Sequence, residues 1–398
     1  TRYQASNIYL TYNPDLGENH NLNVLVGYNV EDKRYQTLTV SQMDMITTSK
    51  PSFSLMQGVA DAPSAGGYTW AYMGAFFRVN YGFKSKYLVE VSGRYDGSSK
   101  FPTYSRWGFF PSASAAWVLS EEPWMKWSRN VLDIAKIRIS AGSMGNGNVD
   151  PYSYTSEMAV KTATDVILGG AYPVYTSVGT TVPVSLTWET ATTYDIGLDL
   201  GFFNNRLSFT GDMYRRYTTD MYTPASSLPA VFGTSAPKGN NAEMMTNGWE
   251  LSLSWRDEFN LGGKPFSYSV KGMVWDNVSK ITKYENATGS LGTVANYIKN
   301  GGTPSNYYVG MTVGEIWGYT IAGLFKDQAD IDNSATHNFQ QASDKITRPG
   351  QVKVVDLDKS GVIDPGEFKV NDHGDLSIIG NQQARYRFGI NLAANGNG

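Results

Sequence analysis

Apolar and polar residues alternate strictly along much of the chain, and the pattern is clearest from Tyr87 to Asp96. There the odd-numbered positions read Tyr, Val, Val, Gly and Tyr, while the even-numbered positions include Glu90, Arg94 and Asp96. A period of two is typical of a β-strand with one apolar and one wet face. The pattern therefore predicts a strand whose second face carries full charges, followed after an outward loop by a partner strand that ends at Trp117.

The same criterion predicts about eleven strands and no helical domain between them. Besides the strand at 87–96 and its partner ending at residue 117, alternation covers 6–13, 21–38, 71–83, 136–141, 194–200, 207–213, 249–255, 266–270 and 386–392. The pair Asn204-Asn205 tolerates the positive φ of a tight hairpin. The connection SEEPWMKWSRN after Trp117 is expected to contain a helical turn.

Short and long connections alternate along the chain. The short ones are PDLGENH, KSK, SEEPWMKWSRN, NN and LGGKP, and the longest lie near 43–70, 143–186, 222–245 and 281–381. Outer-membrane β-barrels have short turns at one rim, long loops at the other and aromatic girdles at both interfaces. Aromatic residues gather beside the short turns here, at Tyr81, Phe83, Tyr87, Phe202 and Phe203.

The charges favour lipid as the partner of the apolar face. A charge on the lipid face at mid-membrane costs about 2–4 kcal/mol, and the strand charges lie on the opposite face. Arg215 is an exception, because it follows Met213 on the apolar side. It lies about ten residues beyond the short turn, where that cost falls to about 0–1 kcal/mol. A soluble sandwich shows the same alternation and remains an alternative.

Composition narrows the function classes. The 398 residues are 41% hydrophobic and 17% charged, with 26 Tyr, 10 Trp and 41 Gly, which suits many strands and turns. A net charge of −3 gives no excess of positive charge of the kind that nucleic-acid-binding proteins carry. The absence of cysteine excludes disulfides, thiolate chemistry and Cys-based zinc sites. No apolar run has the length of a membrane helix.

Several segments resemble the SusC/RagA-type TonB-dependent outer-membrane transporters. They include KYLVEVSGRYDGSSKF, RWGFFPSASAAWVLSEEPW, KIRISAGSMGNGNVDPYSY, LTWETATTYDIGLDLGFFNNRLSF, NAEMMTNGWELSLSW and GEIWGYTIAGLFKDQADID, and they cover nearly the whole chain. The resemblance implies an all-β transmembrane antiparallel barrel of about 22 strands. Residues 1–398 would be its C-terminal portion with about half of the strands, without the N-terminal plug. We therefore expect the chain to be part of a longer protein.

The resemblance also implies a function. Members of this family import glycan oligosaccharides or peptides across the bacterial outer membrane, and a SusD-like surface lipoprotein caps the barrel. TonB supplies the energy through a segment that is missing from this chain. Membrane lipid and lipopolysaccharide would surround the barrel. No enzymatic activity is implied, and the residues alone do not choose between glycan and peptide.

The stretch DLDKSGVIDPGE at 356–367 fits a twelve-residue calcium loop. The candidate ligands are Asp356, Asp358, Ser360, Val362 through its carbonyl, Asp364 and Glu367. A bound Ca²⁺ would brace the loop structurally. The flanks are not the helices of an EF-hand, since VKVV before the loop reads as a strand. The alternative is an Asp/Gly turn that binds no metal.

Two further groups are candidate contact residues. Aromatic residues in the predicted external loops could stack on a ligand or touch the lipoprotein lid: Tyr152, Tyr154, Tyr307, Tyr308, Trp317 and Tyr319. Packing of the loops on themselves is the alternative. Charged residues on the wet faces of strands could line the lumen or pair with neighbours: Glu90, Arg94, Asp96, Arg138 and Arg256.

No catalytic constellation is apparent. His20, His337 and His373 lie far apart in sequence and lack a metal-ligand spacing. A calcium-braced, soluble or surface-exposed glycan-binding module or adhesin is the second hypothesis for the chain, and dependence on detergent would separate it from a barrel. A β-rich glycosidase is a third, but nothing selects the pair of opposed carboxylates it would need.

Overall fold

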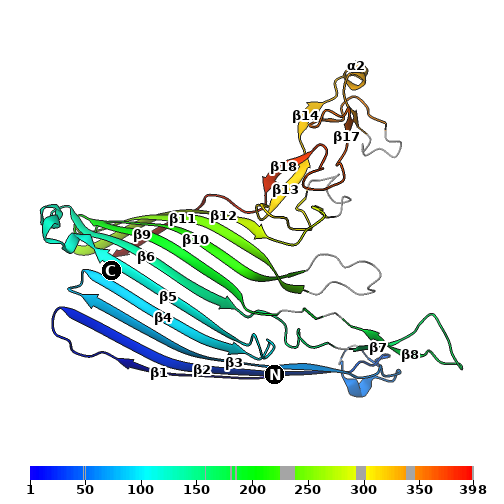
Figure 1. Cartoon of the computed structure of the whole chain (residues 1–398), viewed down its shortest axis with the longest axis horizontal. Helices are drawn as coiled ribbons and strands as arrows, with labels where there is room; N and C mark the ends of the chain where they lie inside the picture. The colour runs from blue at the N-terminus through cyan, green and yellow to red at the C-terminus, as the bar shows by residue number, and fades with distance from the viewer. Residues whose placement is uncertain are drawn as a thin grey trace.

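The computed structural model is built around one large antiparallel sheet of eleven strands (Figure 1). It describes residues 1–47, 49, 51–156, 158–179, 182–183, 186–224, 238–292, 302–337 and 346–396. Neighbours in the sheet follow one another along the chain, in the order β1-β2-β3-β4-β5-β6-β9-β10-β11-β12-β19. Their bounds are Arg2–Tyr12, His20–Thr39, Ser64–Phe83, Tyr87–Ser98, Trp107–Val118, Leu132–Asn146, Glu189–Phe202, Leu207–Pro224, Lys238–Leu261, Lys264–Lys283 and Arg387–Gly396. The predicted number of strands is confirmed.

Several strands are longer than the alternation predicts. β11 starts at Lys238 rather than near residue 249, and β12 runs to Lys283 rather than to residue 270. The connections are consequently 40–63, 147–188, 225–237 and 284–386, and the third of these lies outside the described residues. A ladder needs only backbone hydrogen bonds, so a strand can continue past its alternating stretch with polar residues on both faces. Apolar alternation therefore marks only part of each of these strands.

The short turns adopt the backbone that the sequence predicts. Asn204 and Asn205 have φ of 59° and 58°, and Lys84 and Ser85 have φ of 52° and 56°. The connection after β5 folds instead into two 3₁₀ helices, η2 (Leu119–Glu121) and η3 (Pro123–Ser128). Both expectations, a tight Asn-Asn hairpin and a helical turn, are therefore confirmed.

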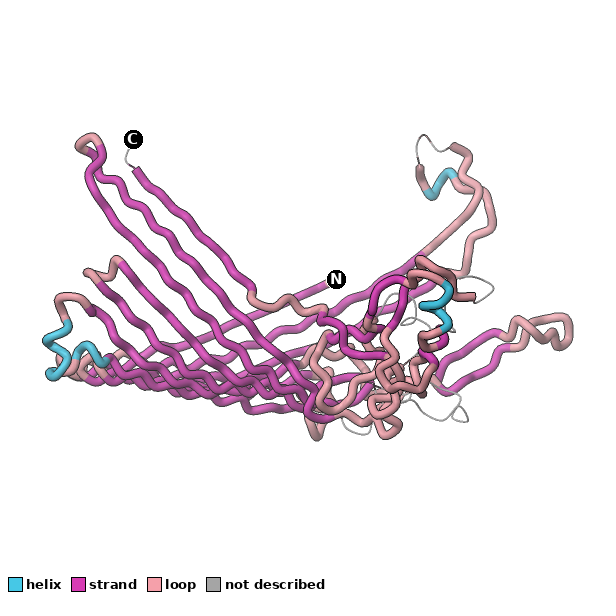
Figure 2. Tube along the Cα trace, turned by 90° about the horizontal axis from the view of Figure 1, so that it is seen from above, coloured by secondary structure: helices cyan, strands magenta, loops and turns pink. Residues whose placement is uncertain are grey.

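The sheet bends into an open trough (Figure 2), and its two faces differ. The apolar face, defined by Val89, Ile139, Leu198 and Leu251, leaves these side chains 44%, 54%, 36% and 39% exposed. The opposite, charged face carries Glu90, Arg94, Arg138 and Asp195, which are half-buried. Side chains spread apart on the convex side of a curved sheet and crowd on the concave side. The higher exposure of the apolar side chains is therefore that of a convex face, and the half-buried charged side chains lie on the concave face. In the described part of the chain no second layer covers the apolar face, which contradicts the soluble-sandwich alternative.

Aromatic side chains form a belt on the apolar face beside the short turns. Phe83 and Tyr87 stack at 6.4 Å between ring centroids, as do Tyr87 and Trp117. Glu122 ties the belt to the following connection, because its Oε1 accepts from the Tyr87 hydroxyl (2.6 Å) and from Trp117 Nε1 (3.1 Å). These bonds lower the pKa of the Glu122 carboxyl, the one to Tyr87 most. The predicted aromatic girdle is present at this rim.

The connection between β12 and β19 folds into a lobe beyond the long-loop rim (Figure 1). It contains the pairs β13 (Glu315–Tyr319) with β18 (Leu376–Asn381), β14 (Ile321–Leu324) with β16 (Val352–Val354) and β15 (Thr336–His337) with β17 (Val362–Ile363), and helix α2 (Gln328–Asp332). Leu291, Trp317, Phe368 and Leu376 form its core. The remaining small elements are η1 (Phe53–Leu55), β7 (Met158–Thr162) and β8 (Val174–Val178). None of the described helices has the length and hydrophobicity to span a membrane.

Candidate functional site

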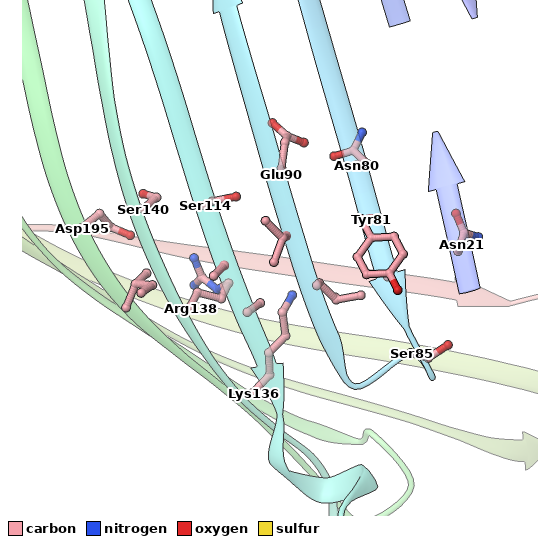
Figure 3. A pocket seen from close by; sticks show the side chains of 16 residues that line it. Asn21, Asn80, Tyr81, Ser85, Glu90, Ser114, Lys136, Arg138, Ser140 and Asp195 are labelled. Carbon is pink, nitrogen blue, oxygen red and sulfur yellow. The ribbon is translucent and has the colours of Figure 1, made fainter. Parts of the chain in front are cut away.

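The charged face forms a shallow cavity of about 470 Å³ across six neighbouring strands (Figure 3). Register brings polar side chains from five of these strands to the same level of the wall: Asn80, Glu90, Ser114, Ser140 and Asp195. The polar lining residues are Asn21, Asn80, Tyr81, Ser85, Glu90, Ser114, Lys136, Arg138, Ser140 and Asp195. Both signs of charge and several neutral donors and acceptors are present, so the wall suits a polar solute rather than one ion type.

Arg138 is the centre of an ionic cluster on this face. Its Nε donates to Asp199 at 2.7 Å and its Nη2 to Asp212 at 2.9 Å, so one guanidinium joins β6, β9 and β10. Lys136 lies 3.9 Å from Asp199. Charge-assisted bonds of this kind hold their partners in fixed geometry. The predicted lumen residue Arg138 is therefore largely engaged by its neighbours.

Replacing Arg138 by methionine is expected to destabilise the folded protein by about 1–3 kcal/mol, because Asp199 and Asp212 would lose their shared charged donor. Arg256→Met is the matched control, since Arg256 is exposed and has no ion pair among the described residues. Urea unfolding of the full-length protein in detergent micelles measures both variants. Equal unfolding midpoints for the two would contradict the assignment of the cluster.

A second cluster holds Arg94 and Asp96 together. Arg94 donates from Nε to Asp96 Oδ2 (3.1 Å) and from Nη2 to Asn29 Oδ1 (3.2 Å), and it lies over the ring of Phe76. Asp96 is buried, with 4% exposure. Glu90 lies 3.7 Å from Arg78. The five predicted lumen residues thus all lie on the charged face of the sheet, and in the ranges that the structure describes all but Arg256 form ion pairs with neighbouring side chains.

An aromatic cluster packs on the charged face at the long-loop end of the trough. Trp188 contacts Phe101 (4.8 Å between ring centroids) and Phe110 (5.5 Å), and Val149 and Leu186 complete a buried core. A Cβ on Gly145 would collide with the ring of Phe110, so the close approach requires glycine. The cluster fixes the loops at 99–106 and 147–156 over the sheet.

The aromatic contact residues separate into two groups. Trp317 is 4% exposed in the lobe core, so the prediction that its ring offers a stacking face is wrong. Tyr308 and Tyr319 pack against that core, and Tyr154 packs against the cluster around Trp188. Burial, followed by its hydrogen bond to Glu315, raises the pKa of the Tyr308 hydroxyl, which stays protonated. Tyr152 is 45% exposed. Tyr307 packs edge-on against Tyr284. Four of the six rings, those of Tyr154, Tyr308, Trp317 and Tyr319, thus pack within the loops and the lobe.

The structure changes the set of carboxylates at the calcium-like loop. Asp356 and Asp358 converge with Asp375, and one oxygen of each lies within 4.8 Å of the others. Asp356 and Asp358 accept backbone N–H bonds from Ser360 (3.1 and 2.9 Å). These bonds lower the pKa of the Asp358 carboxyl, the backbone bond from Ser360 most, and keep it ionised.

Glu367 does not complete the loop as the twelve-residue pattern predicts. Its carboxylate pairs with Lys369, because residues 365–374 form a second turn instead of an exiting helix. That turn returns the chain to Asp375, which is fully buried and accepts from the backbone N–H of Leu357 (2.6 Å) and Asp364 (3.0 Å). Ser360 Oγ donates to the Val362 carbonyl, and Asp364 accepts from Gly366 N–H. Asp375 lies outside the pattern, so sequence spacing alone could not identify it.

Comparison with known proteins gives one family. The family model described as "TonB dependent receptor-like, beta-barrel" matches residues 1–397. TonB-dependent receptor P3 of Formosa agariphila is 29% identical over 98% of this chain and 38% of its own length. TonB-dependent receptor SusC of Bacteroides thetaiotaomicron is 32% identical over 73% of this chain and 27% of its own.

Solved structures give the same fold. The RagAB peptide transporter aligns with 99% of this chain and 39% of the compared chain, at a TM-score of 0.71 and 20% identity. Its closed-closed state aligns with 98% and 39%, at a TM-score of 0.74. The chain therefore spans about two fifths or less of the length of these relatives.

Proposed function

This chain belongs to the TonB-dependent receptor β-barrel family, of SusC/RagA type, and from that premise we propose that it forms one wall of an importer in the bacterial outer membrane. The cargo would be a glycan oligosaccharide or a peptide. A SusD-like surface lipoprotein would cap the barrel, and TonB would supply the energy through a part of the protein outside this chain.

The separation of the two faces carries this proposal. Lipid requires an apolar surface on the outside of a barrel, and a conduit for polar nutrients requires a polar inner wall. Here one sheet of eleven strands separates a concave face with charged and polar side chains from a convex face with exposed apolar side chains. The paired ions make the wall polar without a large net field, which suits a neutral oligosaccharide or a peptide of mixed charge.

The unpaired edges of β1 and β19 support a larger closed barrel. In the described chain each has a strand on one side only. Within a bilayer, unpaired backbone groups cost several kcal/mol each, so both edges need further strands. A barrel of that size has a lumen wide enough to require a plug. The lobe beyond the long-loop rim is a surface that a capping lipoprotein could contact.

Uptake by cells tests this function. A strain that lacks the full-length protein should lose uptake of its cargo from labelled oligosaccharide and peptide pools, and a protonophore should abolish uptake in the parent strain. The pool that disappears from the medium identifies the cargo class. Uptake that survives the protonophore would indicate a passive pore and contradict TonB dependence.

We further propose that Ca²⁺ braces the lobe at Asp356, Asp358 and Asp375. Three carboxylates at such separations repel one another, and a hard cation with flexible oxygen coordination would remove that repulsion. Saturating Ca²⁺ is expected to stabilise the lobe by about 3 kcal/mol at one hundred times its dissociation constant. Thermal unfolding with Ca²⁺ and after chelation measures this effect.

Asp375→Asn is the informative variant for the metal, and Glu367→Gln is its control. Asn keeps an acceptor oxygen for only one of the two backbone N–H bonds that Asp375 accepts from Leu357 and Asp364, so this variant should unfold at a lower temperature even in chelator, and the readout is the shift that Ca²⁺ adds. Glu367 pairs with Lys369 and lies apart from the cluster. The calcium response should disappear in the first variant and persist in the second. An identical unfolding temperature with Ca²⁺ and chelator in the parent protein would end the proposal.

A further inference from the structure

A groove of about 1110 Å³ crosses the apolar face on strands β9 to β12. Tyr194, Ile196, Met213, Tyr217 and Trp249 form its apolar part. Register places Ile196, Met213 and Trp249 side by side on successive strands, and Tyr194 and Tyr217 lie toward the long-loop end. The groove therefore lies on the side of the sheet that faces lipid and cannot be part of the solute path.

The groove contains a cation at its polar end. Arg215 is exposed, and register places it between Tyr194 on β9 and Asn247 on β11. Its Nε donates to Asn247 Oδ1 at 2.7 Å, which orients the guanidinium. No ion pair of Arg215 is found in the part of the chain that the structure describes. The positive charge is consequently fixed in direction and uncompensated.

The two acidic residues of the lining, Asp195 and Asp276, do not neutralise Arg215. Asp195 lies between Tyr194 and Ile196 in β9, so its side chain is on the opposite, charged face. Asp276 is buried and is held by Arg385, whose Nε and Nη2 donate to the two carboxylate oxygens at 2.6 and 2.5 Å. That pair is internally balanced, so the net charge at this end of the groove is that of Arg215. An anion would therefore meet attraction rather than repulsion.

The height of Arg215 identifies the layer of the membrane that it faces. It lies ten residues beyond Asn205 of the short turn, which is about 33 Å along a strand. With the usual strand tilt this is about 25 Å across the membrane, the full height of the apolar band. Arg215 therefore lies at the boundary of the leaflet on the long-loop side, at the level of lipid head groups.

We propose that this groove binds lipopolysaccharide, with an acyl chain along Ile196, Met213 and Trp249 and a lipid A phosphate on Arg215. The outer leaflet of a bacterial outer membrane consists of lipopolysaccharide, whose lipid A carries phosphates at the head-group level. A planar guanidinium pairs with phosphate through two parallel hydrogen bonds. Tyr194 and Tyr217 flank the site as amphipathic interface residues.

A second cation makes lipid A a better fit than a phospholipid with one phosphate. Lys280 is exposed, and register places it opposite Met245, which in turn lies opposite Tyr217. It is therefore two strands and two residues away from Arg215, about 12 Å, on the same face. Lipid A carries a phosphate at each end of its diglucosamine and can reach both cations. The proposal depends on the outer-membrane location of the barrel, not on its cargo.

Native mass spectrometry of the full-length protein in detergent tests the site with three probes: lipid A, lipid A lacking phosphate, and phosphatidylglycerol. We expect one tightly retained lipid A in the parent protein. Arg215→Gln should weaken its retention by about tenfold or more, because a charged hydrogen-bond donor to phosphate is removed. Arg215→Lys should weaken it less, since the charge is kept. Heat-modifiable migration in gels confirms that each variant is folded.

The neighbouring residue provides the matched control. Arg216 is exposed on the charged face and donates to Thr193 Oγ1, so Arg216→Gln removes the same charge without touching the groove. Its retention of lipid A should equal that of the parent. Equal losses in the two variants, equal retention of dephosphorylated lipid A, or equal retention of phosphatidylglycerol would each overturn the proposal.

Discussion

Replacing Trp188 by alanine should release the loops that cover the long-loop end of the charged face. The ring is 6% exposed, packs against Phe101 and Phe110, and donates from Nε1 to the Arg106 carbonyl at 3.1 Å. Truncation of a buried Trp costs about 3–5 kcal/mol, because packing is lost and a cavity remains. Amide exchange in the loops at 99–106 and 147–156 should therefore become about 100-fold faster or more.

Hydrogen exchange with mass spectrometry on the full-length protein measures this effect segment by segment. Trp127→Ala is the matched control, because Trp127 is 80% exposed in the connection after β5. Exposed substitutions of this kind change stability by about 0.5 kcal/mol or less. Exchange in the strands should remain slow in both variants. Unchanged exchange in the two loops of the Trp188 variant would show that the aromatic cluster does not hold them.

A charge at Ile139 should destabilise the barrel through the membrane rather than through the protein. Ile139 is 54% exposed on the apolar face, opposite Ile196 and about halfway along the membrane part of β6. In water, an arginine at so exposed a position would be nearly neutral. In lipid, an arginine at mid-membrane costs about 2–4 kcal/mol. The size of the effect therefore reports what covers the apolar face.

The adjacent residue again supplies the control. Ser140 is on the charged face opposite Asp195, so Ser140→Arg adds the same side chain beside an acid. Its effect should be near zero. Reversible unfolding of the full-length protein in lipid vesicles gives both values. Equal small effects for Ile139→Arg and Ser140→Arg would mean that no lipid contacts the apolar face, and the importer assignment would fail with it.

Much of the architecture was determined by the sequence itself. Strand number, the order of short and long connections, the Asn204-Asn205 hairpin and the side of each strand charge follow from a period of two and from local turn chemistry. These are properties of consecutive residues, so they need no knowledge of distant contacts. The ends of strands such as β11 could not be predicted from the alternation, because outside lipid the backbone hydrogen bonds between strands do not require any pattern of apolar and polar side chains.

Only the tertiary structure decided which polar groups meet. The register of β6, β9 and β10 places Arg138 beside Asp199 and Asp212. In the calcium-like loop, Asp375 takes the place predicted for Glu367 as the third carboxylate, because a second turn returns the chain to Asp356. The same folding buried Trp317 and left Arg215 uncompensated beside Asn247 on the apolar face. Alternation fixes the face of a side chain, but its partner depends on strand register and loop paths. Those are set by contacts between residues far apart in the chain.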